Sequence, residues 1–157
     1  MSIRTVTVRR RLGAPAADLF AVLTDPALFA RVRGIRGVEV LKEGTGGPTS
    51  PGTVRRVSLA AGFLTEEVVA AEGTRFDYRI RDASVPFDHR FGRIEFHDRD
   101  GHTEAAWTST LAFDQPVVAP LLASVAVAGS YVGFAAALHE IDRAARALTT
   151  RPPTKEH

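Results

Sequence analysis

Hydrophobic and polar positions alternate with a period of two along much of the first two thirds of the chain. This alternation is typical of strands that bury one face. The strands predicted in this way cover residues 3–11, a segment after Gly34 that contains Val38 and Val40, and residues 52–59, 63–71, 75–81, 88–98 and 102–113. The last two flank Asp100-Gly101, a strong signal for a two-residue hairpin turn.

Apolar residues recur at steps of three and four in three other segments, which predicts helices there. One short helix opens at Ala14-Pro15 and a second at Asp25-Pro26, where Asp25 can cap the first turn. The third helix is long and covers residues 117–149. Consecutive strands followed by one long helix predict an α+β domain, in which a curved antiparallel sheet wraps that helix.

Composition fits one such domain and excludes several kinds of site. The 157 residues are enough for one globular core, which we assign to residues 1–150, with a polar tail at 151–157. The chain has no cysteine, which excludes disulfides and thiolate metal sites. Together with the lack of a secretory signal pattern, this favours the cytoplasm. Twenty Lys and Arg against 18 Asp and Glu leave the chain nearly neutral, so we expect no nucleic-acid partner.

One long segment, residues 115–138, carries no charge. Its length would cross a bilayer, but its prolines, glycines and many alanines contribute little insertion energy. We therefore expect no membrane span, and interpret the segment as a buried helix face or as a contact with a second subunit. Gly129 and Gly133 would allow the close approach of another chain in a homodimer. Motifs for nucleotide, metalloprotease or serine-hydrolase chemistry are absent from the sequence, and we expect no cofactor and no metal.

Several short motifs stand in a characteristic order. They are APAADLFAVLTDP at residues 14–26, GTVRRV at 52–57, Glu66 followed by Val68, YRI at 78–80, and Gly101-x-Thr103-x-x-x-Trp107. With the long final helix, the chain resembles the START-like (SRPBCC) superfamily, in particular its bacterial polyketide cyclase/dehydratase-like branch. The resemblance covers nearly the whole chain. It implies the helix-grip fold, with about seven strands wrapped around the C-terminal helix and two short helices after the first strand.

The same resemblance implies a hydrophobic cavity between sheet and helix, but no single reaction, because members bind, transport or transform different ligands. The Asp100-Gly101 turn predicts the register at this cavity. The expected cross-strand pairs are Phe96 with Ala105, Ile94 with Trp107, Gly92 with Ser109, Arg90 with Leu111 and Asp88 with Phe113. Asp88 and Arg90 would then face inward and His89 outward, where a general-base role for His89 is a minor alternative. Gly92 either leaves space beside Trp107 or marks a bend in the strand.

Two charged residues lie on predicted inner faces. Arg55 shares a face with Val57, Glu66 shares one with Val68, and the tight turn at 60–62 brings the two strands together. Buried charges are tolerated only when they are paired. One interpretation is an internal ion pair that fixes the sheet. The other makes the pair, with Tyr78 and Ser109, the polar end of an apolar pocket.

The function that we expect is binding of a hydrophobic or aromatic small molecule, lipid-like or polyketide-like, in the cavity. The predicted ligand-binding residues are Arg55, Glu66, Tyr78, Arg90, Gly92, Ile94, Phe96, Trp107, Ser109, Tyr131 and Phe134. An enzyme of the polyketide cyclase/dehydratase type, which performs aldol ring closure and dehydration, is the alternative. Its catalytic candidates are Arg55, Glu66 and Tyr78. A protein-interaction module is a third interpretation.

Overall fold

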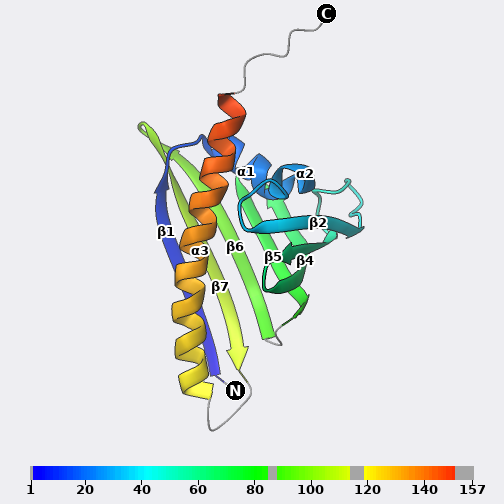
Figure 1. The fold of residues 1–157 in the computed structure, drawn as a ribbon, viewed down its shortest axis with the longest axis vertical. Coiled ribbons are helices and arrows are strands. Elements are labelled where there is room, and N and C mark those ends of the chain that lie inside the picture. Colours follow the sequence, from blue (N-terminus) through cyan, green and yellow to red (C-terminus); the bar gives the residue numbers. More distant parts are fainter. Residues whose placement is uncertain (1, 85–87, 114–118, 151–157) are drawn as a thin grey trace, which may run out of the picture.

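A seven-stranded antiparallel sheet forms the body of the protein in a computed structural model, which describes residues 2–84, 88–113 and 119–150. The strand order is β1-β7-β6-β5-β4-β3-β2 (Figure 1), so the first and last strands of the chain are neighbours. The strands are β1 (Ser2–Leu12), β2 (Ile35–Lys42), β3 (Val54–Leu59), β4 (Gly62–Glu72), β5 (Arg75–Ala83), β6 (Asp88–Arg99) and β7 (His102–Phe113). Every predicted strand is confirmed.

The helices pack on one face of this sheet, which we call the inner face. α1 (Ala16–Thr24) and α2 (Pro26–Phe29) follow β1, and α3 (Ala119–Thr149) follows β7. The side chain of Asp25 caps α2 by accepting a hydrogen bond from the backbone N–H of Ala27 at 2.8 Å. α3 packs mainly against β1 and α1 and touches β7 at few positions, so it lies toward the β1 edge of the sheet (Figure 1). The predicted α+β helix-grip arrangement is confirmed.

Two predictions about the C-terminal region fall partly outside the described residues. The predicted start of the long helix at residue 117 and the tail at 151–157 both lie there. Within the ranges that the structure describes, no helix is both long and apolar enough to span a lipid bilayer.

The core lies where α1 and the C-terminal half of α3 meet the sheet. Leu19 and Leu23 of α1, Phe96 of β6, and Leu138 and Ile141 of α3 belong to one buried cluster, and each is at most 2% exposed. Full burial of a side chain of this size contributes about 1.5–3 kcal/mol relative to exposure. This end of the protein is therefore firmly packed, and it fixes the helices on the sheet.

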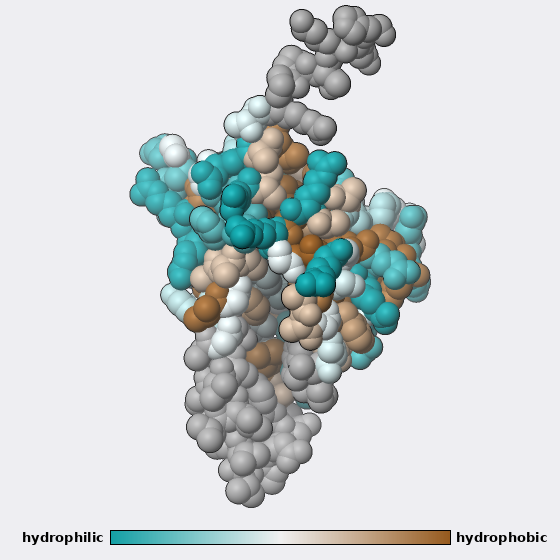
Figure 2. Space-filling view, viewed as in Figure 1, coloured by the Kyte–Doolittle hydropathy of each residue, from teal (hydrophilic) through white to brown (hydrophobic). Residues whose placement is uncertain are grey.

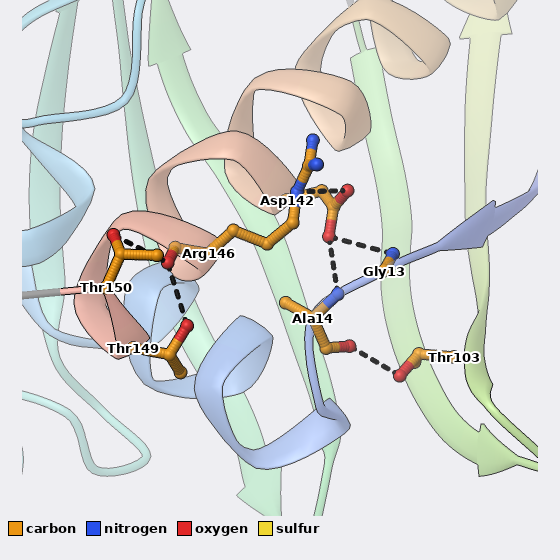
Figure 3. A network of polar contacts seen from close by, with 7 residues as sticks. All are labelled: Gly13, Ala14, Thr103, Asp142, Arg146, Thr149 and Thr150. Carbon is orange, nitrogen blue, oxygen red and sulfur yellow. Dashed lines mark hydrogen bonds and ion pairs between the residues drawn. The ribbon is translucent and has the colours of Figure 1, made fainter.

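A buried carboxylate on α3 strengthens this attachment (Figure 3). Asp142 accepts hydrogen bonds from the backbone N–H groups of Gly13 at 3.1 Å and Ala14 at 2.8 Å, in the turn between β1 and α1. The carbonyl of Ala14 in turn accepts a hydrogen bond from the hydroxyl of Thr103 on β7 at 2.6 Å. Arg146, one helical turn after Asp142, pairs with its carboxylate at 3.3 Å. The turn is thus held to both α3 and β7.

Candidate ligand-binding site

The helices do not cover the inner face evenly. α1 packs on β5 and β6, and α3 packs along β1. Farther along the sheet, the inward-facing side chains of Ile80 and Trp107 keep part of their surface exposed. Figure 2 shows a hollow near the middle of the view, with hydrophobic atoms on its floor. The candidate site is the partly exposed stretch of the inner face around Ile80 and Trp107.

Rings from β5, β6, β7 and α3 form a connected aromatic cluster there. Trp107 stacks on Phe134 of α3, with ring centroids 4.3 Å apart and an angle of 3° between the planes. Tyr78 meets Trp107 edge to face at 6.5 Å and stacks on His89 at 5.2 Å. Such ring pairs contribute about 0.5–1.5 kcal/mol beyond the area that they bury. The cluster therefore joins α3 to the central strands of the sheet.

The hydroxyl of Tyr78 is the polar centre of the aromatic cluster. It accepts a hydrogen bond from the Nε1–H of Trp107 at 2.8 Å, and Ser109 is a second hydrogen-bond partner. Burial raises the pKa of Tyr78 well above its ordinary value of 10.0. The hydrogen bond from Trp107 lowers this pKa in part, and the hydrogen bond with Ser109 lowers it further, whereas the negative charge of Glu66 raises it. Tyr78 is therefore protonated at neutral pH and has a proton to donate.

Gly92 of β6 makes room for the ring of Tyr78. A β carbon at this position would lie 2.2 Å from Cζ and 2.4 Å from Cε1 of Tyr78. The space that the sequence predicts beside Trp107 is thus filled by a side chain of the protein itself. A bend is not centred here either, because the break in the β6–β7 pairing lies between His89 and Phe91.

That break is a β-bulge, and it exchanges the predicted orientations of two residues. The pairing follows the predicted register from the hairpin turn to Phe91 and then shifts, so that His89 takes the inward position instead of Arg90. Arg90 is exposed and pairs with Asp88 at 2.7 Å. The prediction that Asp88 and Arg90 face inward is therefore wrong. The sequence analysis assigned His89 to the outer face because the sequence does not mark the bulge.

His89 is buried against Tyr78 and is neutral at neutral pH. Its Nδ1 accepts a hydrogen bond from the backbone N–H of Ile80 at 3.1 Å, which places the proton of the neutral ring on Nε2. Burial lowers the pKa of His89 to about 4; Arg79 lowers it as well, and Asp88 acts in the opposite direction. His89 therefore adds a polar but uncharged group to the aromatic cluster.

The predicted ion pair between Arg55 and Glu66 is confirmed, and it lies beneath α1. Nε of Arg55 donates to Oε1 of Glu66 at 2.5 Å, and Nη1 donates to the carbonyl of Leu23 near the end of α1 at 2.8 Å. The guanidinium lies over the rings of Phe29 at 4.6 Å and Phe76 at 5.3 Å. Arg55 is only 1% exposed. This geometry favours the interpretation in which the pair fixes the sheet, and here it also fixes α1.

The remaining predicted residues divide into core and edge. Ile94 and Phe96 face inward as predicted, but both are fully buried in the core and leave a ligand no surface to contact. Tyr131 is 45% exposed, and its hydroxyl accepts a hydrogen bond from Arg10 of β1 at 3.4 Å. Because α3 lies toward β1, this hydroxyl is directed to Arg10 and not to Trp107. Phe134 does face the sheet, against Trp107.

The candidate site is suited to hydrogen bonding and not to metal binding. Among the residues that the structure describes, no three His, Asp or Glu side chains are grouped closely enough to hold a metal ion. The polar groups behind Trp107 are its indole N–H, which the hydroxyl of Tyr78 accepts, and the buried hydroxyls and imidazole of Tyr78, Ser109 and His89. Polar groups of this kind orient an apolar ligand that carries an oxygen atom when it reaches them.

The sequence matches the family described as polyketide cyclase / dehydrase and lipid transport over residues 4–146. The chain belongs to this family. No curated protein matches the sequence.

Solved structures show that the fold of this family member is shared widely. A START superfamily protein from Mycobacterium smegmatis is 15% identical with a TM-score of 0.71, and the match covers 92% of this chain and 98% of the other. A Thermus thermophilus protein is 18% identical with a TM-score of 0.70, covering 94% and 100%. The Zhui aromatase/cyclase from a Streptomyces species is 21% identical with a TM-score of 0.67, covering 94% and 98%. These similarities confirm the START-like fold.

Proposed function

We propose that the protein binds a hydrophobic small molecule with an aromatic or polyketide-like ring system on the inner face of the sheet. The observation that carries this proposal is the stack of Trp107 on Phe134, two rings that are each partly exposed, with the hydroxyl of Tyr78 behind it. The family description, which names polyketides and lipid transport, supports this ligand class. We also place this function in the cytoplasm, since a chain without cysteine needs no oxidising compartment.

The geometry supports binding more than catalysis. Aldol ring closure and dehydration need a base to remove a proton and a donor to stabilise the enolate. Tyr78 can donate, but its raised pKa opposes a role as base. Glu66 is held by Arg55 beneath α1, and Nδ1 of His89 already accepts a hydrogen bond from Ile80. The candidate bases are thus occupied by contacts within the protein.

The binding proposal can be tested through the fluorescence of Trp107, which is the only tryptophan of the chain. Titration with 2-acetylnaphthalene should change the emission in a saturable manner. Phe134→Ala should weaken binding about tenfold, because it removes the stacked ring. Tyr131→Ala, on the same helix but against Arg10, is the matched control and should keep the wild-type affinity. Absence of saturable binding, or equal losses in both variants, would contradict the proposal.

For the C-terminal helix we propose a second role, as a contact between two copies of the chain. Val132 is 68% exposed, and Gly129 and Gly133 are exposed on the same uncharged helix segment. Sedimentation equilibrium should then show a dimer that Val132→Asp dissociates. A strict monomer at high protein concentration would exclude this role.

A further inference from the structure

We infer that the site selects ligands without charge: it accepts a neutral aromatic ketone, amide or phenol and rejects a carboxylate of the same shape. This inference rests on the proposed function and names the class of ligand that the site takes. It follows from the placement of the charges on β1, β3, β6 and α3 around the aromatic cluster.

The bulge in β6 removes a cation from the inner face. Strict alternation in β6 would direct the guanidinium of Arg90 toward Tyr78 and Trp107, where it could neutralise an acidic ligand. The shifted register instead leaves Arg90 50% exposed and paired with Asp88 at 2.7 Å. His89 takes the inward position, with its Nδ1 bonded to the N–H of Ile80. An ionised group on a ligand would therefore face the neutral imidazole of His89 and not the guanidinium of Arg90.

Arg55 of β3, a second arginine beneath the helices, is committed to protein groups. Arg55 and Glu66 have no net charge as a pair, and Arg55 also bonds the carbonyl of Leu23. Its Nη2 has no hydrogen-bond partner among the described residues, but the whole residue is 1% exposed and lies against Phe29 and Phe76. A ligand carboxylate could use Arg55 only by displacing Glu66 from it.

The helix opposite the sheet supplies no charge either. The sequence of α3 contains no Asp, Glu, Lys or Arg before residue 140, and Phe134, which stacks on Trp107, belongs to this uncharged part. Arg10 of β1 lies over the ring of Tyr131, 5.3 Å from its centroid, and Tyr131 is partly exposed to solvent. Arg4, opposite Leu111 on the same face of β1, is exposed. Both arginines thus lie on the edge strand of the sheet, and neither β1 nor Tyr131 belongs to the aromatic cluster.

The groups that remain are neutral donors and acceptors. Tyr78, Ser109 and Trp107 are joined by hydrogen bonds, and His89 stacks on Tyr78. The raised pKa of Tyr78 and the lowered pKa of His89 keep both uncharged at pH 7. A ketone or amide oxygen can accept a hydrogen bond from the hydroxyl of Tyr78 without bringing a charge into an apolar site. A carboxylate would lose its hydration without gaining an opposite charge, which is strongly unfavourable.

Probes of one shape and different charge test this inference on the wild-type protein. 2-Acetylnaphthalene, 2-naphthamide and 2-naphthoate share the ring system, and only the last is ionised at pH 7. Titration calorimetry should give similar dissociation constants for the ketone and the amide, and one at least about 100-fold larger for the carboxylate. A carboxylate that binds within tenfold of the ketone overturns the inference and leaves the proposed function standing. Absence of binding by all three probes overturns the proposed function, and the inference with it.

A variant that adds a cation to the inner face provides the reverse test. Ile80→Lys places an ammonium group beside His89, and it should tighten the binding of 2-naphthoate at least about tenfold while weakening that of the ketone. Val69→Lys adds the same charge at an exposed position of β4 and should leave both affinities unchanged. Circular dichroism checks that both variants are folded. Equal gains for the carboxylate in the two variants would show a general charge effect and contradict the inference.

Discussion

Arg55 on β3 and Glu66 on β4 are direct cross-strand partners, and their side chains meet at 2.5 Å beneath the end of α1. Removal of one member of a buried pair leaves the other charge uncompensated in the interior. Glu66→Leu should therefore lower the free energy of unfolding by about 3–5 kcal/mol. Urea denaturation followed by circular dichroism measures this change.

Two further variants distinguish the cost of leaving one buried charge uncompensated from the cost of losing an ion pair as such. Arg55→Met combined with Glu66→Leu replaces both charges by apolar groups of similar size and should recover much of the lost stability. Arg99→Gln breaks a pair with Glu104 in which both side chains are 55% exposed, and it should cost less than about 1 kcal/mol. If Glu66→Leu were as mild as Arg99→Gln, the pair would not be anchoring α1.

The carboxylate of Asp142 should be worth more to stability than its exposed partner Arg146. Asp142→Ala leaves the N–H groups of Gly13 and Ala14 without their acceptor, and should lower the free energy of unfolding by about 1.5–3 kcal/mol. Arg146→Gln removes only a half-exposed ion pair and should cost less than about 1 kcal/mol. Amide hydrogen exchange at Ala14 should accelerate in the first variant alone. Equal effects of the two variants would assign the stabilisation to the ion pair instead.

We expect that no residue larger than glycine fits at position 92 unless the ring of Tyr78 moves. In Gly92→Ala the new methyl group would lie within 2.4 Å of two ring atoms of Tyr78, so ring or strand must move, at a cost of about 1–3 kcal/mol. The emission of Trp107 should shift as well, because its hydrogen bond to Tyr78 is disturbed. Gly37→Ala on β2, where a β carbon meets no atom within 4 Å, is the control and should change stability by less than about 0.5 kcal/mol. An unchanged emission spectrum in Gly92→Ala would contradict this packing.

Local rules were sufficient where the structure follows regular geometry. The Asp100-Gly101 turn fixes the β6–β7 register, and the pairings of Ile94 with Trp107 and of Gly92 with Ser109 are as predicted. The Arg55–Glu66 pair could be predicted for the same reason. Strand alternation puts both side chains on the inner face, and the short turn makes the two residues cross-strand partners.

The candidate site was less predictable because it depends on departures from regular geometry. One extra residue in β6 reverses the faces of His89 and Arg90, and a bulge of this kind depends on packing that alternation alone does not encode. The lateral position of α3 is also set by tertiary contacts. Because the helix lies toward β1, Tyr131 contacts Arg10 and Phe134 contacts Trp107, although the two residues are only three positions apart in the sequence.

The burial of His89 predicts a specific dependence of stability on pH. Its pKa is about 4 in the folded protein, against an ordinary value of 6.5 that applies to the unfolded chain. Between these values the unfolded state binds more protons, so stability rises with pH. The contribution of His89 is therefore complete above pH 6.5 and is lost as the pH falls toward 4. The difference between the two pKa values corresponds to at most about 3 kcal/mol.

Two histidine variants isolate this contribution from the titration of the carboxylates. His89→Phe keeps a ring against Tyr78 but cannot be protonated, so its free energy of unfolding should depend less steeply on pH between 4 and 6.5 than that of the wild type, by up to one proton. His139→Gln removes an exposed histidine of α3 and should keep the wild-type slope. Urea denaturation at intervals of half a pH unit measures all three proteins. Identical slopes for His89→Phe and the wild type would show that the imidazole binds protons equally in the folded and unfolded states, and would contradict its burial against Tyr78.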